Sequence, residues 1–197
     1  MEQKGEYHKS VDELEAELLL IAAAQERPER FQPLYVAYYK PIFLFVFKRT
    51  GDENITEDIV SSVFLKALLN IGKFKFKGVP FSAWLYRIAL NELNLFFRKA
   101  KRERWISLDK NMLHLLASEA SIEEKRYSEN DVLACLTKLP TDALELIELR
   151  FFENLPFAEI AKILEITENN AKVKVYRILE QLRKMLTNQR SGIKKKY

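Results

Sequence analysis

The sequence contains little glycine, proline or cysteine. Its 197 residues include five Gly, six Pro and one Cys. So few glycines and prolines indicate few tight turns, and strict alternation of polar and apolar residues is scarce outside "KFKFK". Leu, Ile, Ala, Glu and Lys dominate instead, and these residues favour helices. We therefore expect an all-α protein.

Residues that could hold a metal or perform catalysis are also scarce. Cys135 has no partner for a disulfide and lies among apolar residues, so we expect it in the core. The two histidines, His8 and His114, are far apart, and no Cys/His ligand cluster is present. The segment "GKFKFKG" lacks the spacing and the ending of a phosphate-binding loop. We expect no metal, no cofactor and no catalytic site, so a helical enzyme such as a nucleic-acid hydrolase is disfavoured.

A long hydrophobic run is missing too. The longest, Leu18 to Ala24, is too short to span a bilayer. The N-terminus is acidic and polar, unlike a signal peptide. These features predict a cytoplasmic protein with no membrane insertion.

The net charge of +4 is small, but it is unevenly distributed. The first 32 residues hold eight acids and four bases, whereas residues 98–104, "RKAKRER", hold five bases and one acid. Basic charge confined to one segment suits a polyanionic partner. A solvated helix end is the simpler alternative.

The composition along the chain predicts two small helical domains joined by a linker, the second a helix-turn-helix, winged-helix-like domain. In the first, "NITEDIVSSVFLKALLNIG" is typical of a helix that begins near Thr56, Glu57 and Asp58 and stops at Gly72. We expect a tail and helix in residues 1–29, the first domain in 10–104, the linker in 105–130, the second domain in 131–187 and a basic tail in 188–197.

One expected helix carries an unusual polar stripe. At about 100° per residue, an indole, two guanidiniums and two amides share a face: Trp84, Arg87, Asn91, Asn94 and Arg98. A merely solvated face would carry Glu and Lys pairs, but this stripe contains no acid. An indole can stack on an unpaired base, and Arg and Asn can bind base edges and phosphates. Cations flank the stripe at Lys73, Lys75, Lys77, Lys99 and Lys101. We therefore expect it to bind opened DNA.

A helix-turn-helix pattern follows in the second domain. Apolar residues recur through "FAEIAKIL", "EITE" forms the turn, and Thr167 can cap the next helix. That helix has a core stripe at Ala171, Val175, Ile178 and Leu182. Asn169, Val173, Tyr176 and Glu180 point away from it, flanked by Lys172, Lys174, Arg177 and Arg183. Such a helix could enter a major groove, whereas a helical hairpin with a polar outer face remains the alternative.

These segments resemble a known family. "ITEDIVSSVFLKAL", then "FSAWLYRIALNELNLFFRKAKR", then "LTKLPTDALELIELRFFENLPFAEIAKILEITENNAKVKVYRILEQLRK" are similar to the extracytoplasmic-function (ECF) sigma factors of bacterial RNA polymerase. The resemblance covers about residues 30–105 and 130–187. It implies a subunit that directs core polymerase to promoters. The first domain would bind the clamp helices of the largest subunit and melt the −10 element. The second would bind the −35 element and the flap of the other large subunit.

The resemblance also implies roles for particular residues. The linker, residues 105–130, would thread toward the RNA exit path, and the loop 73–78 would capture a flipped base. Core-polymerase binding would fall to Asp58, Ile59, Val63, Phe64 and Lys66. Binding of the −10 element would fall to Lys73, Lys75, Lys77, Trp84, Arg87, Asn91, Asn94 and Arg98. Binding of the −35 element would fall to Asn169, Asn170, Lys172, Lys174 and Arg177.

Three residues depart from the family pattern. Ser61 and Ser62 stand where the family often has a polar-acidic pair, and Glu165 stands where the turn usually has Gly. A positive φ at Glu165 would cost roughly 1–2 kcal/mol. Control by an anti-sigma factor stays open. An autonomous helix-turn-helix regulator, whose first domain senses a ligand or dimerises, is the alternative function.

Overall fold

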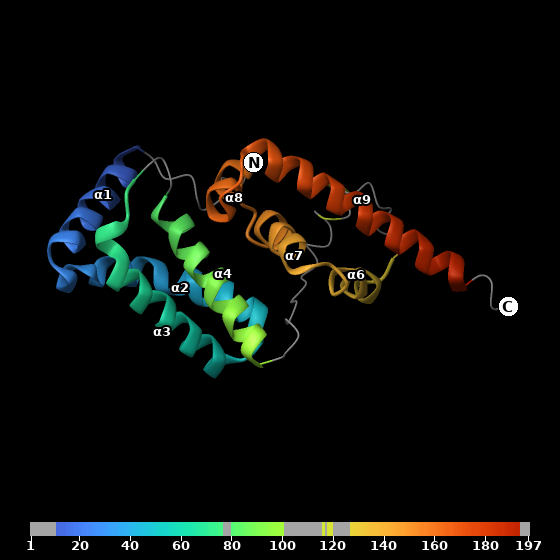
Figure 1. Cartoon of the computed structure of the whole chain (residues 1–197), viewed down its shortest axis with the longest axis horizontal. Coiled ribbons are helices and arrows are strands. Elements are labelled where there is room, and N and C mark those ends of the chain that lie inside the picture. Colours follow the sequence, from blue (N-terminus) through green and yellow to red (C-terminus); the bar gives the residue numbers. More distant parts are fainter. Residues whose placement is uncertain (1–10, 77–79, 101–115, 117, 120–126, 194–197) are drawn as a thin grey trace. The chain divides into compact units, whose positions relative to one another are not determined.

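The computed structural model describes residues 11–76, 80–100, 116, 118–119 and 127–193 (Figure 1). Every regular element within these ranges is helical, which confirms the predicted all-α class. The chain divides into two compact units, Met1–Trp105 and Ile106–Tyr197. Each unit has its own buried core.

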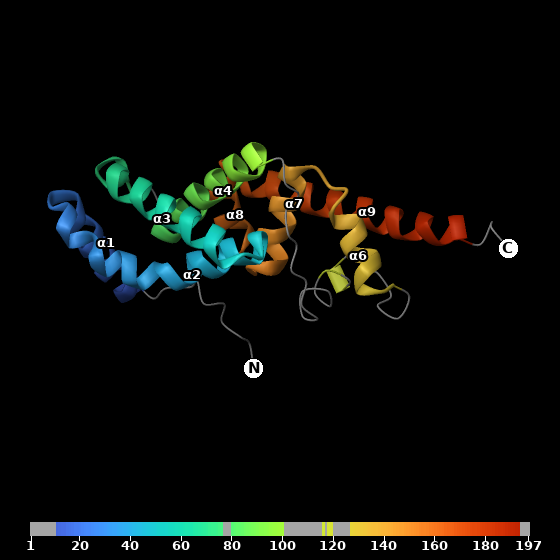
Figure 2. The same cartoon turned by 90° about the horizontal axis from the view of Figure 1, so that it is seen from below.

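In its described residues, the first unit contains four α-helices. They are α1 (Val11–Glu26), α2 (Gln32–Thr50), α3 (Glu53–Asn70) and α4 (Phe81–Ala100), with short 3₁₀ turns η1 (Pro28–Phe31) and η2 (Ile71–Lys73). Helix α3 packs along both α2 and α4, and Figures 1 and 2 show the three helices side by side. Ile42, Phe45, Val63, Leu85 and Leu93 are fully buried between them.

Helix α3 begins earlier than predicted. Gly51 adopts a left-handed conformation with φ 63°, which ends α2, and Asp52 then caps α3 by accepting a hydrogen bond from the Ile55 backbone N–H at 3.1 Å. The predicted stretch begins at Asn54, one residue from the observed start, but the expected cap near Thr56 was wrong, because Asp52 caps the helix directly after the turn. Thr56 is buried inside the helix, and its hydroxyl donates to the Asp52 carbonyl at 2.6 Å. At the other end, Gly72 lies in η2, just after α3 stops.

The second unit is a helical bundle around its last helix. Its helices are α6 (Glu129–Leu136), α7 (Thr141–Ile147), which continues into a π-helical turn (Glu148–Phe152), α8 (Phe157–Leu164) and α9 (Glu168–Ile193). Helix α9 packs against α6, α7 and α8. Cys135 is buried as predicted, and its burial raises the pKa of the thiol.

Helices α8 and α9 form the predicted helix-turn-helix. The Thr167 hydroxyl accepts a hydrogen bond from the Asn170 backbone N–H at 3.2 Å, so it caps α9 as expected. The predicted core stripe of α9 is also confirmed, because Ala171, Val175, Ile178 and Leu182 are all buried. Glu165 in the turn adopts φ 54° and ψ 42°, the left-handed conformation that favours glycine.

Part of the segment expected to be a linker packs within the second unit. Leu116 is buried, and the Glu119 carboxylate pairs with the Arg150 guanidinium at 3.1 Å. The same guanidinium donates to the Leu155 carbonyl at 3.3 Å and lies over the Phe157 ring at the start of α8. This part of the chain is therefore attached beside the helix-turn-helix.

The described ranges contain neither a membrane-spanning helix nor a metal-binding cluster. No helix there is both long and apolar enough to cross a lipid bilayer. No three His, Cys, Asp or Glu side chains in these ranges are grouped so that they could hold a metal ion.

Candidate nucleic-acid interfaces

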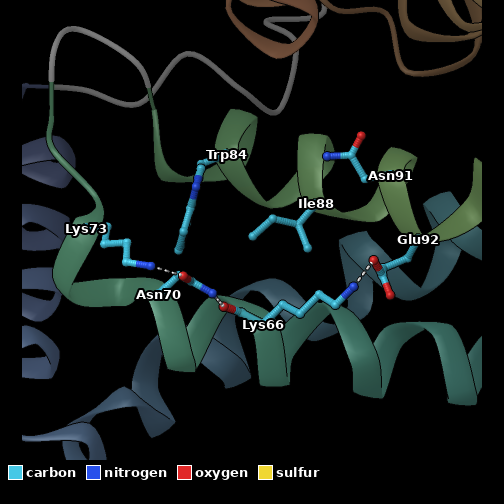
Figure 3. Close-up of a pocket in the computed structure, with 7 residues that line it drawn as sticks. All are labelled: Lys66, Asn70, Lys73, Trp84, Ile88, Asn91 and Glu92. Carbon is cyan, nitrogen blue, oxygen red and sulfur yellow. Dashed lines mark hydrogen bonds and ion pairs between the residues drawn. The ribbon is translucent and has the colours of Figure 1, made fainter. Parts of the chain in front are cut away.

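A pocket of about 360 Å³ lies between α3 and α4, on the side of α4 that carries the polar stripe. Figure 3 shows that α3 and η2 form one wall and α4 the other. Two of its residues, Trp84 and Asn91, belong to the predicted stripe, and Lys73 belongs to the predicted flanking cations. The full lining is Lys66, Asn70, Lys73, Trp84, Ile88, Asn91 and Glu92.

Hydrogen bonds fix the polar groups along the α3 wall. The Asn70 amide donates to the Lys66 carbonyl at 2.9 Å, and its oxygen accepts from the Lys73 ammonium at 3.0 Å (Figure 3). Lys66 pairs with Glu92 across the pocket, from α3 to α4. The Glu92 side chain is only 11% exposed, so its charge is held in a partly desolvated position. The pocket thus offers both hydrogen-bond donors and an acceptor.

An aromatic cluster holds Trp84 in place. Its ring centroid lies 5.2 Å from Phe74 and 5.4 Å from Phe81. The indole is half-buried and extends from α4 toward Asn70 (Figure 3). The Gln25 side chain of α1 donates to the carbonyls of Ile71 and Phe74, at 3.0 and 2.8 Å. The ring contacts thus fix the indole on the α4 side of the pocket, and Gln25 fixes the backbone on either side of Lys73.

These features suit a flat polar ligand. An indole supplies a stacking surface, and amide, ammonium and carboxylate groups supply hydrogen bonds to the ligand's edge. The volume lies within the range of small-molecule sites. A single unpaired nucleobase has this combination of an aromatic face and a polar edge.

The other residues predicted for the −10 element are distributed around this pocket. Arg87 and Asn94 are half-buried on α4, and Arg98 is exposed near its end. Lys75 is exposed, whereas Lys77 lies outside the described residues.

Sequence reasoning missed three members of the pocket, Asn70, Ile88 and Glu92. All three come from positions outside the predicted polar stripe of α4, so only the packing of α3 on α4 reveals them. Glu92 follows Asn91 directly in the sequence, but its pairing with Lys66 depends on contacts between residues 26 positions apart.

The residues predicted to bind core polymerase fall into two groups on α3. Asp58 and Lys66 are exposed, but Ile59, Val63 and Phe64 are buried in the first unit. The burial of Ile59, Val63 and Phe64 does not fit a direct contact with core polymerase, because their apolar side chains pack α3 against the neighbouring helices. The exposed apolar residues of α3 are instead Leu65 and Leu69, which are 57% and 71% exposed.

A second polar surface covers the outer side of α9. Asn169, Asn170, Lys172 and Arg177 are exposed as predicted, and Lys174 is half-buried. Lys172 pairs with Glu168 at 2.8 Å, one turn earlier on the same helix. Because the core stripe holds the opposite side of α9, this surface is free to face a groove of duplex DNA.

Family models of known proteins match the two units of the chain separately. The family model of sigma-70 region 2 matches residues 34–103, and that of sigma-70, region 4 matches residues 129–182. The ECF RNA polymerase sigma factor SigX of Bacillus subtilis is 30% identical over 164 residues, which cover 79% of this chain and 83% of SigX. The ECF RNA polymerase sigma factor BldN of Streptomyces coelicolor is 29% identical over 162 residues, which cover 80% of this chain but only 61% of BldN.

Two solved structures share the fold. CnrH, solved with the cytosolic domain of CnrY, has a TM-score of 0.55 and 21% identity, covering 88% of this chain and 96% of CnrH. The sigma factor RpoE of Bartonella quintana, solved with the anti-sigma factor NepR, has a TM-score of 0.52 and 19% identity, covering 80% of this chain and 96% of RpoE. The two family models and the identity to SigX show that the chain belongs to the ECF sigma factors, the sigma-70 family proteins of transcription initiation.

Proposed function

We propose that this chain directs core RNA polymerase to promoters by binding two separate DNA elements and opening one of them. Residues 10–104 take an unpaired base of the −10 element into the α3–α4 pocket. Residues 131–187 place α9 in the major groove of the −35 element. The chain acts by binding and performs no catalytic step of its own.

The observation that supports opening is the position of Trp84 beside polar groups. Its indole lies over a pocket whose other members include the Asn91 amide and the Lys73 ammonium. A base that leaves the duplex loses its stacking energy, and the indole replaces about 1–3 kcal/mol of it. Arg87, Asn94, Arg98, Lys75 and Lys77 complete the proposed −10 surface, as cations and amides that hold the strand's phosphates and base edges.

Attachment to the polymerase is assigned to the exposed side of α3. Leu65 and Leu69 lie one turn apart and expose apolar surface, which suits a helical partner such as the clamp helices. Asp58 adds a charge near the start of the helix, while Ile59, Val63 and Phe64 support it from the core. Lys66, paired with Glu92, contributes to the pocket wall.

The −35 element is assigned to α9. The amides of Asn169 and Asn170 read base edges, and Lys172, Lys174 and Arg177 hold phosphates on either side. The second unit also contacts the polymerase flap, and residues 105–130 pass toward the RNA exit path.

The proposed setting is the cytoplasm, where the polymerase acts. Two proteins of similar fold were solved with CnrY and with the anti-sigma factor NepR. We extend this to the present chain as a proposal: an inhibitory protein binds it and blocks access to core polymerase.

Co-elution of the purified chain with core RNA polymerase on a sizing column tests this function. We expect a stable complex that initiates transcription at a specific set of promoters. A matched pair of variants, Leu69→Glu on α3 and Leu19→Glu on α1, separates the proposed docking face from other exposed leucines. Failure of the native chain to bind core polymerase, together with tight binding to duplex DNA alone, would instead indicate an autonomous regulator.

A further inference from the structure

Two apolar side chains are exposed on the outer side of α9. Val173 and Tyr176 are 38% and 56% exposed, and they are the large exposed apolar residues among the described part of Ile106–Tyr197. Three positions apart on a helix, they are neighbours on one face. Their surroundings are polar, with Asn169, Lys172 and Arg177 exposed on the same side.

The two side chains are held in different ways. Tyr176 lies beside Phe157 of α8, with ring centroids 6.4 Å apart and planes tilted by 41°. The Lys172 ammonium lies 5.9 Å from the same Phe157 ring, so aromatic and cationic groups are in contact there. Val173 is β-branched, which restricts its χ1 rotation within a helix. The apolar patch is therefore presented in a defined orientation.

The major groove contains one apolar group that such a patch can recognise. Each thymine exposes a C5-methyl there, whereas the other three bases carry no methyl group. The amides and cations that surround the patch suit the base edges and phosphates of a DNA groove. An apolar contact with a protein partner would not require them. Building on the proposed function, we propose that Val173, with Tyr176 beside it, contacts the C5-methyl of a thymine in the −35 element and so selects that base.

Replacement of single thymines by deoxyuridine tests this contact, because it removes only the methyl group. The complex of the full chain with core polymerase first selects its preferred site from promoter duplexes randomised in the −35 region. Each thymine of that site is then replaced in turn, and the dissociation constant is measured. We expect one or two positions at which deoxyuridine weakens binding about fourfold, the effect of burying one methyl less.

Variants of Val173 connect the effect to this side chain. In Val173→Ala the difference between thymine and deoxyuridine should largely disappear at those positions. In Val173→Ile, which keeps a β-branched apolar side chain, it should persist. Lys184→Ala, about three turns further along α9, is the control that should leave it unchanged.

Two results would overturn the inference. If no thymine can be distinguished from deoxyuridine, or if Val173→Ala keeps the full difference, the patch does not read a methyl and serves another contact, such as a protein. In both cases the complex would still select a −35 sequence, so the proposed function would be retained. If the complex selects no −35 sequence at all, the proposed function fails, and the inference fails with it.

Discussion

Replacing Trp84 by Ala removes the stacking surface of the α3–α4 pocket. The indole is half-buried, contacts the rings of Phe74 and Phe81, and lines the pocket. Loss of one base–aromatic stack costs about 1–3 kcal/mol, which corresponds to about a 5- to 150-fold loss in the equilibrium for promoter opening. Trp84→Phe keeps an aromatic face and should lose less than Trp84→Ala.

Permanganate reactivity of unpaired thymines measures opening directly, with core polymerase and a promoter that the native chain opens. The substitution also removes packing against two rings, so a second variant must separate opening from stability. Leu90→Ala on the same helix removes a buried side chain that does not line the pocket, and it should lower the free energy of unfolding by about 2–5 kcal/mol. The reasoning is refuted if Trp84→Ala opens the promoter as well as the native chain, or if opening follows stability alone across these variants.

Three further predictions concern single side chains. Burial and the hydrogen bond to the Glu17 carboxylate raise the pKa of Tyr38, so the stability that Tyr38 contributes is present below about pH 10 and is lost as the pH rises further. Tyr38→Phe should lower the free energy of unfolding by about 1–3 kcal/mol. In thermal melts, the variant should also lose less stability at alkaline pH than the native chain. Glu165→Gly should stabilise the second unit by about 0.5–1 kcal/mol in urea unfolding, because glycine adopts φ 54° without strain; destabilisation would contradict this. Lys172→Gln should weaken −35 binding and reduce the slope of log K against log salt by about one, whereas Lys184→Gln should not; equal slopes would remove Lys172 from the phosphate contacts.

Helix α9 was predictable because its sequence repeats at the helical period. Ala171, Val175, Ile178 and Leu182 share a face in the sequence pattern and are all buried in the structure. Thr167 likewise caps the helix as its position implied. Such local patterns depend on neighbours along the chain, so the sequence alone contains them.

The α3–α4 pocket was only half predictable. Trp84 and Asn91 follow from the polar stripe of one helix, but Asn70 and Glu92 enter the pocket only because α3 packs on α4. The same limit applies to α3 itself, where the family resemblance suggested Val63 and Phe64 as contact residues. Their burial depends on the aromatic side chains of α2, including Tyr35, whose ring centroid lies 4.8 Å from that of Phe64.

Site-specific photo-crosslinking tests the central claim, that one chain binds two separate promoter elements through these two surfaces. A photoreactive amino acid replaces Lys73 at the pocket or Arg177 on α9, and the complex with core polymerase is irradiated on one promoter. The account predicts that position 73 crosslinks to the unpaired strand of the −10 element and that position 177 crosslinks to duplex DNA at the −35 element. Crosslinks from both positions to the same element, or from position 73 to intact duplex alone, would contradict it.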